Sequence, residues 1–359
     1  MTRYQDVQAQ LQVEPKTWLI TGVAGFIGSH LLETLLGLDQ TVVGLDNFST
    51  GSPRNLAEVA SRVGRNKFTR FLFMEGDIRD PSACGVATQG VDVVLHDAAL
   101  GSVPRSMVDP LSTHCANVDG FVNVLLAAHA AQVKRVVYAS SSSVYGDDPS
   151  KIKVETRLGR PLSPYATTKL IDETYADAFH RTHGIESVGL RYFNVFGPRQ
   201  DPRGPYAAVI PRWTENLFRG EQCIVYGDGS NSRDFCFVDN VVQANLLAAC
   251  APSTDVTAGV FNVACGARTT LLELYEAIRH EVAAFDPSAR EQTLRSEAPR
   301  PGDVPHSLAS IERACNVLGY QPTHDVSQGL KRTIGHFANA GRPTGTMDAS
   351  VNGYIQSTI

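Results

Sequence analysis

A tyrosine and a lysine four residues apart are the side chains of this sequence best suited to acid–base chemistry. In "SPYATTKLIDETYADAF", Ser163 and Pro164 are typical of a helix N-terminus, and Tyr165 and Lys169 then share one helix face. A free phenol has a pKa of ~10, and lowering it by about three units requires ~4 kcal/mol of preferential stabilisation of the phenolate. A buried lysine ammonium, together with a positively charged cofactor ring, would supply this and make Tyr165 a general base for an alcohol. Alone, the same spacing is common on solvated helices.

A run of serines offers hydroxyl groups for the same chemistry. The stretch "YASSSSVYGD", residues 138–147, follows the apolar "RVV". A serine run without context is typical of a linker, but this one is expected at the carboxyl end of a parallel strand, where such sheets bind ligands. Ser141, Ser142 and Ser143 are therefore candidate site residues.

A glycine-rich turn predicts a dinucleotide site. "TWLITGVAGFIGSHLLETLL" places Gly22, Gly25 and Gly28 between a strand and a helix, where a pyrophosphate rests on the helix N-terminus, although a purely structural turn would also explain three glycines. The next strand ends in Asp46, whose carboxylate can accept hydrogen bonds from a ribose and would repel a 2′-phosphate, which favours NAD over NADP. Two further strands are expected to end at the same edge of the sheet, in Asp77–Ile78 and Ala98–Ala99.

The elements that must position these residues alternate along the first 200 residues. Short β-branched runs and helical patterns predict an α/β fold, a Rossmann-type doubly wound parallel sheet with seven strands in this part. Beyond residue 200, prolines and glycines interrupt shorter elements, which indicates a smaller α/β C-terminal substrate-binding cap, with "GVFNVAC" returning to the sheet. The expected segments are an N-terminal extension (1–16), an NAD-binding domain (17–200, with 232–265 returning to it), a mainly substrate-binding domain (201–338) and a polar tail (339–359).

The composition predicts a cytoplasmic protein. A net charge of −5 gives no electrostatic reason to expect nucleic acid or an anionic membrane as partner. The seven cysteines, an odd count without a CxxC pair, argue against a disulfide framework and a zinc ribbon, and no metal is expected. The N-terminus lacks the apolar core of a signal peptide, and no later run approaches the ~18 apolar residues of a membrane span.

The motifs, taken in order, resemble those of the extended short-chain dehydrogenase/reductase family, and within it the UDP-hexose 4-epimerases. They are "TGVAGFIG", "LDNFSTG", "GDI", "HDAAL", "SSSSVYG", "YATTK", "RYFNVFGPRQ", "SRDFCFVDN" and "RPGDV", and the resemblance runs from about residue 16 to 335. The chain looks most like the branch that acts on N-acetylated UDP-sugars in bacterial surface-polysaccharide pathways such as O-antigen synthesis. The implied reaction oxidises C4 of the sugar to a ketone, turns the sugar and returns the hydride to the other face, with NAD bound throughout.

The resemblance implies roles at matching positions. Tyr165 is the implied base, Lys169 is implied to hydrogen-bond the nicotinamide ribose, and Ser141 to hydrogen-bond the sugar's O4. The implied cofactor-binding residues are Gly22, Gly25, Phe26, Ile27, Gly28, Asp46, Asn47, Ser49, Thr50, Gly51, Asp77, Ile78, Ala98, Ala99, Tyr165, Lys169 and Tyr192. The implied substrate-binding residues are Ser102, Ser141, Ser142, Ser143, Asn194, Ala208, Val209, Tyr226, Arg233, Arg300, Asp303 and Ser307.

Ser142 and Ser143 also narrow the set of reactions that the resemblance allows. Members of the family that eliminate water across C5 and C6 typically carry Asp-Glu at these two positions, and decarboxylating members tend to have Glu where Ser143 stands. Without these carboxylates, oxidation at C4 has no obvious acid–base partner for a second step, so simple epimerisation is expected.

Ser307 bears on which sugar is bound. Glucose/galactose-restricted relatives often carry a bulky tyrosine four residues after the Asp of the "RP.D" motif, and Ser307 stands at that spacing from Asp303. A small residue leaves room for a 2-acetamido group, which favours UDP-GlcNAc/UDP-GalNAc interconversion, although a serine that faces solvent would look the same. The alternatives are UDP-glucose and the uronic acids UDP-N-acetylglucosaminuronic acid and UDP-glucuronic acid, whose carboxylate the serine run and Arg105 could meet.

Three further expectations concern the role of His96, the oligomeric state and the possibility that the protein binds NAD without catalysing a reaction. His96 is predicted to be a packed strand-end histidine rather than an acid–base group. The apolar faces of helices 113–131 and 165–183 suggest a homodimer, although the sequence also permits a monomer. A catalytically silent NAD-binding scaffold is disfavoured because Ser141, Tyr165 and Lys169 are all present.

Overall fold

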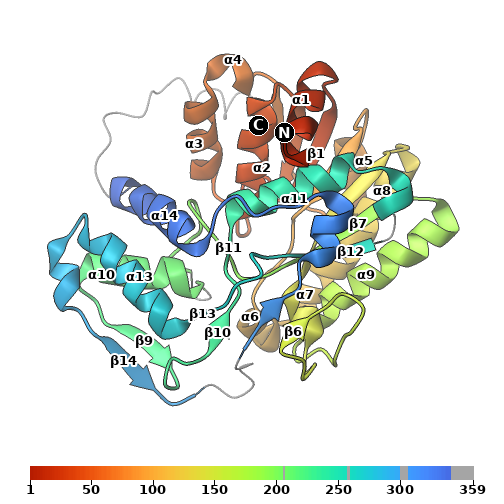
Figure 1. The fold of residues 1–359 in the computed structure, drawn as a ribbon. Helices are drawn as coiled ribbons and strands as arrows, with labels where there is room; N and C mark the ends of the chain where they lie inside the picture. The colour runs from red at the N-terminus through yellow and green to blue at the C-terminus, as the bar shows by residue number, and fades with distance from the viewer. Residues whose placement is uncertain (205–206, 257–258, 300–305, 341–359) are drawn as a thin grey trace.

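A seven-stranded parallel sheet forms the centre of the molecule (Figure 1). The structure is a computed structural model that describes residues 1–204, 207–256, 259–299 and 306–340. The strand order β12-β7-β5-β4-β1-β2-β3 places β1 between β2 and β4, which is the predicted doubly wound arrangement. The strands are β1 Thr17–Thr21, β2 Thr41–Asp46, β3 Phe71–Glu75, β4 Val93–His96, β5 Arg135–Ser141, β7 Ser187–Tyr192 and β12 Gly259–Val263.

The prediction of seven strands within the first 200 residues is wrong, because only six strands of the large sheet lie there. The edge beside β7 is filled instead by β12, from the stretch expected to return to the sheet, with Phe261 opposite Leu190. The run "SVGLRYFNVFG" gives β7 and then turns at Asn194, where φ is 33°. Its last part forms the short strand β8 (Val195–Phe196), which pairs with β11 (Cys236–Phe237) outside the large sheet.

Helices cover both faces of the sheet because successive residues of each strand point to opposite sides. On β1, Trp18 and Ile20 pack into one core with α2, α3 and α11, whereas Leu19 packs into a second core with α5, α8 and α9. The expected helix 113–131 is helical up to Ala130, but a π-helical turn at Cys115–Asp119 lies between α7 and α8. The helices of this part are α2 Phe26–Gly37, α3 Pro53–Val63, α4 Arg65–Phe68, α5 Pro81–Ala87, α6 Val103–Val108, α7 Pro110–His114, α8 Gly120–Ala130, α9 Pro164–His183 and α11 Val238–Cys250.

The N-terminal extension contains a helix that the sequence pattern did not predict. Helix α1 (Arg3–Val13) begins with a capping box between Thr2 and Gln5. Its Val7 and Leu11 are buried against the main core. With two buried positions in eleven residues, its amphipathic signal is too weak to stand out in the sequence.

A second group of elements, built mainly from residues beyond 200, packs around its own core. Figure 1 shows α10, α13, β9, β14 and α14 gathered to one side of the large sheet. Short strand pairs β10–β13, β11–β8 and β15–β6 accompany the parallel pair β14–β9. The further elements are β6 Ile152–Lys153, α10 Val209–Arg219, β9 Cys223–Tyr226, β10 Ser232–Arg233, α12 Ser253–Val256, β13 Thr269–Thr270, α13 Leu271–Ala283, β14 Leu294–Glu297, β15 Leu308–Ala309 and α14 Val326–Ala340. Within the described part of the chain, no helix combines the length and apolar character needed to cross a membrane.

Candidate active site

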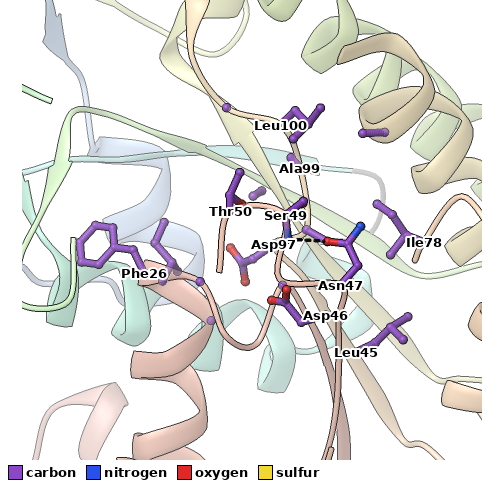
Figure 2. Close-up of a pocket in the computed structure, with 18 of the residues that line it drawn as sticks. Phe26, Leu45, Asp46, Asn47, Ser49, Thr50, Ile78, Asp97, Ala99 and Leu100 are labelled. Atoms are coloured by element: carbon purple, nitrogen blue, oxygen red, sulfur yellow. Dashed lines mark hydrogen bonds between the residues drawn. The ribbon is translucent and has the colours of Figure 1, made fainter. Parts of the chain in front are cut away.

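A cavity of about 490 Å³ opens at the carboxyl ends of the parallel strands (Figure 2). This volume lies within the usual range for small-molecule sites. All three predicted catalytic residues line it, and so does every predicted cofactor-binding residue except Gly51. The cavity therefore joins the glycine-rich turn to the serine run and to the Tyr165–Lys169 pair.

The glycine-rich turn has no room for side chains. Gly22 has a φ of 73°, and a Cβ there would lie 2.8 Å from the backbone nitrogen of Ala98. A Cβ on Gly28 would lie 2.2 Å from the carbonyl oxygen of Gly22. Helix α2 starts at Phe26, and its N-cap Gly25 has no side chain to bond the first N–H groups. These N–H groups and the helix dipole form a site for a pyrophosphate.

The two acids predicted for the adenosine side are held in different ways. Asp46 is buried at the end of β2 and accepts the backbone N–H groups of Ala24 (2.9 Å) and Phe48 (2.8 Å). Burial raises the pKa of Asp46, while these two hydrogen bonds oppose the rise. Gly51 lies just outside the cavity, where a Cβ would come within 3.0 Å of Asp46 Oδ1.

Asp77 lies farther along this side of the cavity. It accepts hydrogen bonds from Asn47 Nδ2 (2.7 Å) and from Arg79 Nε (2.9 Å) and Nη2 (2.6 Å). The bonds from Arg79 lower the pKa of Asp77 to about 2. Figure 2 shows Asn47 also accepting the N–H of Ser49 (3.0 Å). Arg79 lines the cavity as well, although the sequence did not single it out.

The start of helix α9 holds Tyr165 and Lys169 at the other end of the cavity. Ser163 caps the helix by accepting the N–H of Ala166 (3.1 Å), as its sequence predicted. Lys169 is 2% exposed, and its Nζ donates to Ala139 O (2.9 Å) and Asp172 Oδ2 (3.2 Å). Burial opposes the ammonium charge, but the carboxylate of Asp172 and the nearby Tyr165 outweigh it and raise the pKa of Lys169. A positive charge is thus fixed one helical turn from the Tyr165 phenol.

The serine run leaves β5 and enters a 3₁₀ turn at Ser142–Tyr145. Ser141 lines the cavity, whereas Ser142 and Ser143 do not. Ser143 donates its backbone N–H (3.1 Å) and its hydroxyl (2.9 Å) to Ser141 Oγ. Ser140 lines the cavity as well, and it donates to Glu173 Oε1 (2.6 Å).

The other predicted substrate residues that the structure describes lie outside this cavity. Arg233 and Ser307 are brought together through Ser232, whose carbonyl accepts the N–H of Ser307 (3.0 Å). Asn194 Nδ2 donates to the carbonyl of Asp234 (3.1 Å), next to Arg233. Ser102 caps α6, Ala208 and Val209 begin α10, and Tyr226 ends β9. Arg300 and Asp303 lie outside the described residues.

Two residues at the end of β4 behave differently although they are neighbours. His96 is buried, its Nδ1 lies 2.8 Å from Thr21 Oγ1, and burial lowers its pKa to about 3, so it is the packed histidine that was predicted. Asp97 lines the cavity and was not predicted, although the "HDAAL" motif contains it. Its position at the carboxyl edge of a strand was the available signal.

Comparisons with known proteins identify relatives of this chain. Residues 18–264 match the NAD dependent epimerase/dehydratase family. The UDP-glucose 4-epimerase of Mycolicibacterium smegmatis is 37% identical over 323 residues, which cover 89% of this chain and 98% of that protein. The UDP-glucuronate 4-epimerase 4 of Arabidopsis thaliana is 30% identical over 89% of this chain and 74% of its own length.

A solved structure is similar over nearly the whole fold. It is the UDP-N-acetylglucosamine 4-epimerase from Methanobrevibacter ruminantium M1 in complex with UDP-N-acetylmuramic acid, with a TM-score of 0.82 and 35% identity. The match covers 91% of this chain and 99% of that one. With a glycine turn that fits a pyrophosphate and an acid that fits a ribose, the chain belongs to the NAD-dependent epimerase/dehydratase family.

Proposed function

We propose that this protein is a UDP-sugar 4-epimerase that interconverts UDP-GlcNAc and UDP-GalNAc as precursors of a surface polysaccharide. The observation that carries the proposal is the buried ammonium of Lys169, one turn from the Tyr165 phenol, in the cavity that also holds Asp46 and the glycine turn. The glycine turn, Asp46 and Lys169 would hold NAD, which would supply the hydride acceptor and donor for C4 of the sugar. Net oxidation is zero, so turnover needs no added cofactor.

Tyr165 moves the proton in both half-reactions. As the C4–H hydride leaves, Tyr165 takes the proton of the C4 hydroxyl, and a ketone forms. The ketone then presents its other face, and Tyr165 returns the proton to the oxygen as the hydride comes back to carbon. Hydrogen bonds to Ala139 and Asp172 hold the Lys169 ammonium in place. From this position its positive charge stabilises the phenolate.

Ser141 is set up to donate a hydrogen bond to the sugar. Its Oγ already accepts two hydrogen bonds from Ser143, so its own hydroxyl hydrogen is free to point elsewhere. Because Ser141 lines the cavity, O4 of the sugar is the acceptor we assign to it. Ser143 thus orients Ser141, where dehydratases of this family would carry a carboxylate.

The choice of an N-acetylated sugar is supported by Ser307 and by one relative. Ser307 lies beside Arg233, the arginine proposed to hold the UDP phosphates, and its small side chain leaves space for an acetamido group. The similar structure from Methanobrevibacter ruminantium M1 is a UDP-N-acetylglucosamine 4-epimerase. A uronic acid substrate is the second candidate, favoured by the Arabidopsis UDP-glucuronate relative.

Purified protein should convert one sugar epimer into the other without added NAD. Tyr165→Phe should keep cofactor and UDP-sugar binding and lower kcat by at least ~100-fold. Tyr175→Phe is the matched control, because Tyr175 lies on the same helix but does not line the cavity, and the variant keeps the apolar ring that the dimer proposed below would use. Substrate consumption that requires stoichiometric NADH release, or an unchanged kcat in Tyr165→Phe, would contradict the proposal. A competition assay with UDP-glucose, UDP-GlcNAc and its uronic acid then identifies the sugar.

We also propose that two copies pair through α8 and α9. Leu126 on α8 is 48% exposed and Tyr175 on α9 is 40% exposed, which leaves apolar groups on both helices for a partner. Light scattering should give twice the chain mass of 38.8 kDa, and a monomer at micromolar concentration would exclude this assembly.

A further inference from the structure

Two cysteines from separate parts of the chain meet beside the start of α11. Cys236 belongs to β11, and Cys265 lies two residues beyond the end of β12. The Cys236 thiol donates a hydrogen bond to Cys265 Sγ. The Tyr320 hydroxyl lies 3.9 Å from Cys236 Sγ and donates to the carbonyl of Ala264, next to Cys265, at 2.9 Å. The two sulfur atoms are therefore neighbours in the fold, although α11 separates the cysteines along the chain.

The backbone of Cys265 is held by the segment that also carries Cys236. Asp234 lies two residues before Cys236, and its Oδ1 accepts the backbone N–H of Cys265 (2.9 Å). Asp234 Oδ2 accepts the N–H of Gly266 (3.0 Å). One short segment thus contacts Cys265 through both its backbone and its sulfur. A disulfide of about 2.05 Å then requires the two side chains to approach each other, while the backbone segments already meet.

The surroundings of Cys265 Sγ favour a thiolate. Asn240 Nδ2 donates to this sulfur at 3.5 Å, and so does the backbone N–H of Phe237, the N-cap residue of α11. The N-terminus of this 13-residue helix carries the positive end of its dipole. The hydrogen bond from Cys236 lowers the pKa of Cys265, while burial and the charge of Asp234 oppose this effect. The thiolate is the form of cysteine that attacks an oxidant.

The two cysteines are suited to different steps of an oxidation. Cys265 is partly exposed and leads into the exposed residues 266–268. Cys236 is fully buried, and burial raises its pKa well above the ordinary value, so it stays a thiol next to the sulfur of Cys265. Burial also raises the pKa of four other cysteines, which are Cys84, Cys223, Cys250 and Cys315. Cys265 is thus suited to react first and Cys236 to resolve the product.

We propose that Cys265 and Cys236 form a reversible disulfide when the protein meets hydrogen peroxide. The Cys265 thiolate attacks one peroxide oxygen, an S–O bond forms, the O–O bond breaks, and the hydroxide that leaves takes up a proton to become water. The Cys236 sulfur then attacks the sulfenic acid sulfur, the S–S bond forms, and the S–O bond breaks with release of a second water, which carries the Cys236 proton. Two thiols are oxidised by two electrons, and the peroxide is reduced. This chemistry needs neither NAD nor a sugar, so it is independent of the proposed function.

Peptide mapping of the unaltered full-length protein tests the proposal directly. The reduced protein is treated with hydrogen peroxide, the remaining thiols are blocked in denaturant, and the chain is cut before its aspartates. Cleavage before Asp239 and Asp255 places Cys236, Cys250 and Cys265 on three separate peptides. We expect the loss of two thiols per chain and a linked pair of peptides that contains Cys236 and Cys265. Dithiothreitol should separate the two peptides and restore both thiols.

Two variants separate the roles of the two sulfurs. Cys236→Ser should stop the reaction at a Cys265 sulfenic acid, which dimedone captures. Cys315→Ser is the matched control, because Cys315 is also partly exposed, and it should form the link as the unaltered protein does. Oxidation of Cys115 or Cys315 before Cys265, or overoxidation of Cys265 while Cys236 remains a thiol, would overturn the proposal. Because the mapping uses the unaltered protein, its result does not depend on whether a variant folds.

Discussion

A buried ion pair lies behind the active site, and its removal offers the sharpest test of how the fold stabilises that site. Arg191 of β7 is 2% exposed and forms a two-pronged contact with Glu173 of α9, with Nε–Oε1 at 2.8 Å and Nη2–Oε2 at 2.7 Å. Burial opposes the charge of Arg191, but the hydrogen bonds and charge of Glu173 outweigh it and raise the arginine's pKa. Glu173 also accepts the Ser140 hydroxyl, so the pair ties together α9, β7 and the end of β5.

Removing either partner should destabilise the protein, with a different pH dependence for each. Glu173→Gln leaves a buried guanidinium that cannot lose its proton, so it should lower the free energy of unfolding by ~3–5 kcal/mol at every pH between about 5 and 8. Arg191→Met leaves Glu173, which can become neutral. An ordinary glutamate has a pKa of ~4.3, so taking up a proton costs ~4 kcal/mol at pH 7 and ~1 kcal/mol at pH 5.

The sign of this difference follows from linkage. In Arg191→Met the folded state binds a proton that the unfolded state releases, so the variant should lose ~1.4 kcal/mol of stability for each pH unit above ~4.3 until the folded-state pKa is reached. Urea unfolding followed by circular dichroism at pH 5, 6, 7 and 8 measures both slopes. The exposed pair Arg181–Asp177 on the same helix is the control, and Asp177→Asn should cost less than ~1 kcal/mol. A Glu173→Gln cost below ~1 kcal/mol, or parallel pH slopes for the two variants, would refute this reasoning.

Three further predictions concern the glycine-rich turn, the choice of sugar and the buried Asp234. Gly28→Ala should abolish NAD retention, since its Cβ would lie 2.2 Å from the Gly22 carbonyl oxygen. Gly37→Ala, whose Cβ would have no atom of the described residues within 4 Å, should retain NAD. The amount of cofactor that stays bound through gel filtration decides this. Ser307→Tyr should reduce activity on N-acetylated sugars more than on UDP-glucose, and equal losses would show that Ser307 does not gate the pocket. Burial raises the pKa of Asp234 to about 6, so its proton favours folding below the ordinary pKa and that advantage is lost as pH rises through 6. The stability advantage of the unaltered protein over Asp234→Asn should therefore shrink by up to ~3 kcal/mol between pH 4 and 6, and a constant difference in urea unfolding would contradict it.

Most of the sheet could be predicted because its strands carry their own local signal. The runs at 17–21, 41–46 and 135–141 coincide with β1, β2 and β5, since continuous β-branched stretches between turns fit strands buried on both faces. The glycine turn, Asp46 and the Tyr165–Lys169 pair were found for a related reason. Each depends on spacing within one short segment, and the structure places all of them around one cavity.

The residues that the sequence did not reveal are those whose role depends on what lies opposite them in space. Asp234 accepts the N–H groups of Cys265, Gly266 and Ala309, from two segments far along the chain, and this fixes the neighbouring Arg233. No spacing within "SRDFCFVDN" can indicate those partners, because an aspartate there could equally face water.

Asp97 shows the same limit at the catalytic end. In the sequence it is a single polar residue between a predicted strand and two alanines. The parallel order β4-β5-β7 brings the Tyr192 hydroxyl to its Oδ1, while its Oδ2 is buried and has no hydrogen-bond partner among the described residues. A buried carboxylate oxygen without a donor costs free energy, and a folded protein tolerates such a cost chiefly where it serves function. The order of the strands in the sheet, rather than any motif, thus decides which groups surround this aspartate.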